Sequence, residues 1–149
     1  MKTLNVLLLC ATFVVNSKAF VTKTLEQVNL QEIDSQCYSQ FGKGLKVFDN
    51  DGYLIEDNET INHILRCTWE KIGVVSEGGL DLYKLHRILE DNLKDQYNNY
   101  VRTYLASRTV QSCVGIQGQN LGDICVKTYN CIFRQLSKSI KLLTEEAAS

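Results

Sequence analysis

Five cysteines that follow the N-terminal segment constrain the fold of this chain more than any other sequence feature. They are Cys37, Cys67, Cys113, Cys125 and Cys131, and the intervals between them hold 29, 45, 11 and 5 residues. In an oxidising compartment such cysteines form disulfides. Because the number is odd, at least one thiol stays unpaired or joins another molecule.

The first 19 residues have the pattern of a secretory signal peptide. Lys2 gives a basic start, residues 4–15 form an apolar run broken only at two positions, and Ser17 and Ala19 are the small residues expected before a cleavage site. The run is too short to span a bilayer. We therefore predict that residues 1–19 are removed, with Cys10 among them, and that the protein is secreted into an extracellular fluid.

The remaining chain, residues 20–149, has the size of one domain. Removal of the leader takes away two lysines and no acid, so the formal charge goes from −1 to −3. A mildly acidic surface of mixed charge argues against nucleic acid and anionic membranes as partners. The partner predicted for this domain from its charge is small, or neutral, or both.

The apolar residues of this domain recur at helical spacing, and the chain contains no proline. No alternating run is long enough to build a sheet, and residues 45–57 are polar and rich in turn formers. The predicted stripes are Leu30, Ile33, Cys37 and Phe41; Ile61, Ile64, Leu65, Trp69 and Ile72; Leu82, Leu85, Leu89 and Leu93; Tyr97, Val101, Tyr104 and Leu105; and Tyr129, Ile132, Phe133, Leu136, Ile140 and Leu143. Short amphipathic helices must share a core, so we predict an all-α fold of about six short helices, stapled by disulfides.

Catalytic and metal-binding patterns are weak. Residues 49–52 (DNDG) invite a calcium-loop interpretation, but Val47 and Asn58 then stand where the loop needs carboxylates. Only His63 and His86 are available as bases near neutral pH, and no nucleophile motif accompanies them. We predict no metal, no cofactor and no enzymatic activity.

Three segments, in this order, carry a resemblance to a known family. They are RCTWEKIGVV at residues 66–75, EGGLDL at 77–82 and GDICVKTY at 122–129. Together with the leader and the cysteine intervals, they resemble the insect pheromone- and general odorant-binding proteins. The resemblance covers nearly all of residues 20–149, and it implies helices arranged around one apolar cavity.

The chain departs from the family pattern at one cysteine. The family usually has six cysteines, and its second falls on His63 here, whereas Cys67 matches the third. Cys125 matches the fifth, which in the family is bonded to the second. The resemblance thus implies that Cys125 is a free thiol near His63, where it would be reactive or a metal ligand, or else buried and inert.

Family pairing implies two disulfides, one between Cys37 and Cys67 and one between Cys113 and Cys131. The last cysteine of the family usually follows the fifth after eight residues, but Cys131 follows Cys125 after five. Since three residues are nearly one helical turn, Cys131 can still face Cys113. A Cys113–Cys125 bond with Cys131 free is the alternative.

The resemblance implies a carrier of small hydrophobic or odorant-like molecules. Alternatives are a salivary or seminal relative that scavenges amines or lipids, and a disulfide-linked interaction protein. We expect a monomer or weak homodimer, with a membrane receptor as a candidate partner at delivery, and Asn58 in the sequon Asn58-Glu59-Thr60 as a candidate glycosylation site. The predicted ligand-binding residues are Ile64, Leu65, Trp69, Leu85, Leu89, Val101, Tyr104, Leu105, Phe133 and Leu136.

Overall fold

The computed structural model describes residues 35–41 and 44–149, and most of them are helical. A helix covers 35–41. It is followed by α3 (Glu59–Lys71), β1 (Val75–Ser76), β2 (Gly79–Leu80), α4 (Leu82–Asn92), α5 (Asn99–Ser112) and α6 (Leu121–Ala148). The all-α prediction is confirmed, although the leader and the first part of the first predicted stripe lie outside the described residues.

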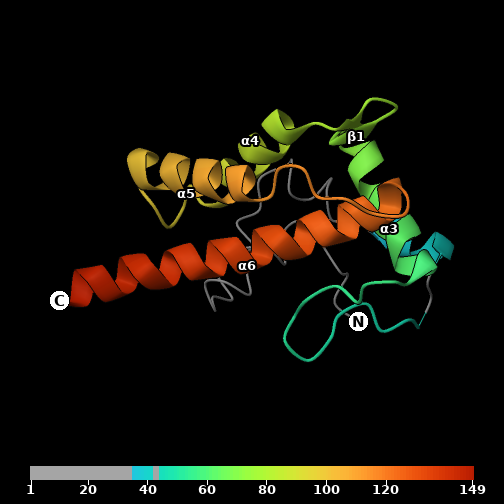
Figure 1. Cartoon of the computed structure of the whole chain (residues 1–149), viewed down its shortest axis with the longest axis horizontal. Helices are drawn as coiled ribbons and strands as arrows, with labels where there is room; N and C mark the ends of the chain where they lie inside the picture. The colour runs from blue at the N-terminus through green and yellow to red at the C-terminus, as the bar shows by residue number, and fades with distance from the viewer. Residues whose placement is uncertain (1–34, 42–43) are drawn as a thin grey trace.

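Helix α6 is not short, in contrast to the prediction for the helices as a set. It has 28 residues and forms the long rod that runs across the molecule in Figure 1, with α5 beside it. No proline or glycine interrupts the chain after Gly122, and the apolar stripe continues to Ile140 and Leu143. Nothing in this segment therefore ends the helix.

The four longer helices are α3, α4, α5 and α6, and each of them has an asparagine or aspartate as its N-cap. The side chains of Asn58, Asp81, Asn98 and Asn120 each accept a hydrogen bond from the backbone N–H three residues later, at 2.9–3.1 Å. Such an N-cap satisfies one of the free donors of the first turn and contributes about 1 kcal/mol. The helix starts are thus set by local sequence.

A tight hairpin joins α3 to α4. Helix α3 ends at Lys71, just before Gly73, because Gly73 adopts a φ of 74° that other residues reach only at a cost. The two-residue strands then pair Val75 with Leu80 in antiparallel register. This turn brings α4 back toward α3.

Helices α3 and α6 cross at very close range. A Cβ placed on Gly122 would lie 2.8 Å from the backbone oxygen of Asn62, so only glycine fits at this point. One turn further on, Cys125 and Val126 are buried, as are Leu65 and Trp69 of α3. The main core therefore forms around this crossing.

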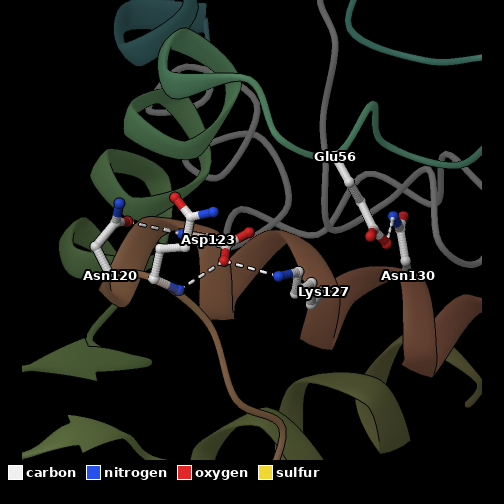
Figure 2. Close-up of polar contacts among 6 residues, drawn as sticks. Glu56, Asn120, Asp123, Lys127 and Asn130 are labelled. Carbon is white, nitrogen blue, oxygen red and sulfur yellow. Dashed lines mark hydrogen bonds and ion pairs between the residues drawn. The ribbon is translucent and has the colours of Figure 1, made fainter.

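Residues 44–57 form a loop that packs on α6. The side chain of Asn130 accepts from the Leu54 N–H and donates to the Leu54 carbonyl, both at 2.9 Å, so it completes a backbone-like pair. Its Nδ2 also donates to Glu56 Oε1 at 2.9 Å (Figure 2). The ring of Tyr53 meets that of Phe133 edge-on at 5.0 Å.

The first turn of α6 holds a buried aspartate, Asp123, that is paired with the partly exposed Lys127. Oδ2 of Asp123 accepts from Lys127 Nζ and from the Gln119 N–H, each at 2.8 Å (Figure 2). These two donors keep the pKa of Asp123 below its usual value, against the opposing effect of burial. Negative charge at a helix N-terminus is also favoured by the helix dipole.

Two disulfides staple the fold, one between Cys37 and Cys67 and the other between Cys113 and Cys131. They are the pairs that the family resemblance implies. The first ties helix 35–41 to α3, and the second ties the end of α5 to α6. Helix α4 carries no cysteine.

Candidate functional site

A small pocket lies where α3, α4 and α6 meet. Its volume is about 20 Å³. Trp69 comes from α3, four residues come from α4, and two come from α6. The lining residues are Trp69, Leu85, Ile88, Leu89, Asn92, Tyr129 and Ile132.

The helical repeat explains why these side chains converge. Leu85, Ile88, Leu89 and Asn92 follow i, i+3, i+4, i+7 spacing, so they share one face of α4. Trp69 is fully buried in the last turn of α3. The hairpin after Gly73 turns α4 back, so that its face covers the indole.

The chemistry of the pocket wall is apolar with one amide. None of the described residues that line it is charged, and Asn92, Tyr129 and Trp69 are those among them that carry a polar group. The indole N–H of Trp69 is buried and has no hydrogen-bond acceptor in the structure. Such a wall suits an uncharged molecule, because an ionised group buried here without a partner is strongly disfavoured.

The size of the pocket limits what it holds without rearrangement. A volume of about 20 Å³ accommodates roughly one water molecule. A ligand of several carbons therefore enters only when the wall moves.

The sequence profile of the PBP/GOBP family, the insect pheromone- and odorant-binding proteins, matches residues 18–135. The chain belongs to this family. Searches of curated proteins and of solved structures gave no match. The family is one of binding and carrier proteins, and its members take small hydrophobic ligands.

The structure brings three of the ten predicted ligand-binding residues of this PBP/GOBP protein to the pocket, namely Trp69, Leu85 and Leu89. Six others are not among its lining residues: five are buried elsewhere and one is half-buried. These are Ile64, Leu65, Leu105, Phe133, Leu136 and the half-buried Val101. Their contact with a ligand stays a prediction.

Tyr104 lies differently from its prediction as a cavity residue. It is 43% exposed, and its hydroxyl accepts a hydrogen bond of 2.5 Å from the Arg108 guanidinium one turn along α5. The buried face of α5 runs through Leu105, Ala106 and Thr109. Tyr104 stands about 100° from Leu105 around the helix, so it points to solvent.

Four lining residues of this family member were missing from the predicted set. Tyr129 and Ile132 were recognised as helix-face residues but not assigned to a site. Ile88 and Asn92 complete the stripe of α4, so the helical repeat was the signal that could have found them. Asn92 is the polar member of this α4 stripe, and a polar side chain on a buried helix face needs a hydrogen-bond partner.

The free thiol of this PBP/GOBP protein is Cys125, and it is fully buried. Burial raises the pKa of Cys125 to about 12, although the positive charge of Arg66 acts in the opposite direction. His63 stacks on Phe41 and faces Glu59 at 3.7 Å, so its described contacts do not include the thiol. The geometry supports the inert thiol rather than the reactive one, and no group of three or more His, Cys, Asp and Glu that could hold a metal occurs in residues 35–41 and 44–149.

Cys125 is expected to resist thiol reagents in the folded protein. At pH 8, a chain that begins at residue 20 should react with a disulfide reagent at least about 100-fold more slowly than an exposed cysteine, because little thiolate forms. In denaturant the same chain should react with one equivalent of the reagent, at the single free cysteine of the described part. A Ser149→Cys variant, altered at the exposed C-terminus, supplies the matched fast-reacting thiol. Rapid reaction of the unaltered folded protein would show that Cys125 is accessible.

Proposed function

We propose that the protein is a secreted carrier that binds small, uncharged hydrophobic molecules between α3, α4 and α6. The observation that carries this proposal is the pocket, whose described lining is apolar except for neutral polar groups. Membership of the PBP/GOBP family supports it. Within the described residues, no helix is long and apolar enough to span a membrane.

Helix α4 is the wall that we expect to move when a ligand enters. The two disulfides connect helix 35–41 to α3 and α5 to α6, whereas α4 is held by packing and hydrogen bonds alone. It is also the shortest of the four longer helices, with 11 residues. A displacement of α4 enlarges the pocket without breaking a covalent cross-link.

The binding energy of such a ligand comes from its apolar area. Each buried methylene contributes about 0.8 kcal/mol, so a chain of about ten carbons supplies roughly 8 kcal/mol. The cost of displacing α4 is subtracted from this sum, and a Kd near or above the micromolar range follows.

The C-terminal part of α6 leaves the pocket free. The α6 residues that line it are Tyr129 and Ile132, and the helix continues straight to Ala148. Glu145 is exposed and lies 3.8 Å from Lys141 on the same helix. None of the residues in the last turns of α6 lines the pocket.

The alternatives differ in what they require of the site. An amine scavenger needs an acidic side chain in its site, and the described lining of this pocket has none. A disulfide-linked assembly needs an accessible cysteine, and the free cysteine of the described part is buried. Both observations favour the carrier of neutral ligands.

A fluorescent-probe assay tests the carrier function. We expect N-phenyl-1-naphthylamine to bind saturably to the protein purified from the medium of secreting cells, and long-chain alcohols to displace it better than biogenic amines. Leu89→Trp, which fills the pocket, should weaken probe binding at least about tenfold, equivalent to about 1.4 kcal/mol. Leu142→Trp, at an exposed position on α6, is the matched control and should bind the probe normally.

Circular dichroism establishes that both variants fold. Equal binding by the two folded variants would remove this pocket as the site. Preferential displacement by amines would instead favour the scavenger.

A further inference from the structure

A cluster of hydroxyl, imidazole and carboxyl groups lies between α4 and α5, outside the pocket. Helix α4 supplies His86 and Glu90, which are one turn apart. Helix α5 supplies Ser107 and Thr103, also one turn apart, on the facing side. The Ser107 Oγ lies 3.0 Å from His86 Nε2, and His86 Nδ1 lies 3.9 Å from Glu90 Oε2.

The surroundings of the imidazole favour one of its two neutral tautomers. The Glu90 carboxylate lies 3.9 Å from Nδ1, beyond hydrogen-bond distance, and its negative charge favours the tautomer with the proton on Nδ1. Nε2 is then an acceptor, and Ser107 Oγ–H donates to it. The other oxygen of Glu90 accepts a hydrogen bond from Thr103 Oγ1, which orients the carboxylate.

The order of groups is therefore hydroxyl, base and carboxylate, as in an activated serine nucleophile. The cluster lies at the edge of the α4–α5 interface, where the His86 and Glu90 side chains are 21% and 22% exposed. Ser107 is half-buried. A small reagent can thus approach the hydroxyl from solvent.

We propose that Ser107 accepts an acyl group from small uncharged esters with a good leaving group. In this step Ser107 Oγ attacks the ester carbonyl carbon, and His86 Nε2 takes the hydroxyl proton. The new Oγ–C bond forms, and the bond to the leaving oxygen breaks with its electron pair. The imidazolium then returns the proton to that oxygen, so the products are an acyl-serine and an alcohol or phenol.

The position of Ser107 in α5 makes this reaction stoichiometric. It lies inside a helix that spans Asn99–Ser112, where backbone N–H groups are engaged in the helical ladder. No pair of free N–H donors is therefore available to stabilise an oxyanion. Formation of the acyl-serine expels an aryl oxide, which leaves readily without such help. Hydrolysis of the acyl-serine would have to expel the serine alkoxide, which does not leave readily, so the acyl group stays on Ser107.

This site is separate from the proposed ligand pocket. His86 and Glu90 each lie one position beyond Leu85 and Leu89, about 100° around α4, on the side that faces α5. Acylation of Ser107 therefore uses none of the residues that line the pocket.

Mass spectrometry of the full chain treated with p-nitrophenyl acetate tests the proposal. We expect one acetyl group per protein, located on Ser107 by peptide mapping, with release of one equivalent of p-nitrophenolate and no sustained turnover. Ser107→Ala should lose the label, and His86→Gln should slow labelling at least about 100-fold, the scale of general-base catalysis. Ser112→Ala is the matched control, since Ser112 is an exposed serine on the same helix whose Oγ bonds to the Arg108 carbonyl.

Peptide mapping of the unaltered protein needs no variant, so it decides the question even where a substitution impairs folding. A cluster that only holds α4 against α5 predicts no preference for Ser107 over other serines. Labelling spread over several serines, no labelling at all, or full labelling of folded His86→Gln would each overturn the proposal.

Discussion

Replacing both Cys37 and Cys67 with serine is expected to lower the free energy of unfolding by about 4 kcal/mol. The disulfide joins residues that are 30 positions apart, and closing a loop of that length restricts the unfolded chain by this amount in the chain-entropy description. A domain of this size is stable by only about 5–15 kcal/mol, so the loss is a large fraction of the total.

The effect should concentrate at one end of the molecule. The helix over 35–41 is too short to persist alone, and its described polar anchors are few. Tyr38 donates to the Leu45 carbonyl at 3.0 Å, and Lys71 donates to Gln36 at 3.2 Å. Without the disulfide, these bonds and the packing of the helix must hold it in place.

Urea denaturation measures the change in stability, and amide hydrogen exchange locates it. Cys125→Ala is the appropriate control, because it also removes a sulfur but breaks no cross-link, and it should cost only about 1 kcal/mol. Equal losses for the two proteins would contradict a special role of the Cys37–Cys67 bond.

Replacing Asn130 with alanine is expected to cost about 3 kcal/mol. Leu54 is buried, and both its N–H and its carbonyl depend on the Asn130 amide. Each buried backbone group left without a partner costs about 1–3 kcal/mol, reduced where water can enter beside the loop. The bond to Glu56 is lost as well.

The expected signature is a local one at residues 44–57. Hydrogen exchange of Leu54 should accelerate, and the contact between Tyr53 and Phe133 should loosen, because Asn130 is the polar link between the loop and α6 (Figure 2). Asn99→Ala is the matched control, since Asn99 is an exposed helix residue whose described partner is the Arg102 side chain. A loss below about 1 kcal/mol for Asn130→Ala would indicate that water replaces the amide.

Much of the secondary structure was predictable because it depends on local interactions. Helical spacing of apolar residues, asparagine or aspartate at the start of the four longer helices and Gly73 after the end of α3 all act within one or two turns. The length of α6 is the exception: the same local pattern continues through Leu143, and its significance was underestimated. The disulfide pairs followed from the family resemblance, and the structure has the same two pairs.

The candidate site was only partly predictable. Periodicity places Leu85, Leu89 and Trp69 on buried faces, but it gives no information on which buried residues border a pocket. Tyr104 shows this limit most clearly. The predicted buried face of α5 includes Tyr104, whereas the observed one is centred on Leu105 and Thr109. The two faces differ by a small rotation of α5 about its axis. That rotation is set by how α5 packs against α4 and α6.

The sequence by itself determined that this chain is helical and that at least one of its five later cysteines lacks an intramolecular partner. Tertiary structure alone decided which side chains contact one another across different helices and loops. Asn130 reaches a loop 76 residues away, and His86 reaches Ser107 over 21 residues. Such contacts depend on helix crossings, which the combined packing of many side chains fixes, and no local pattern encodes them.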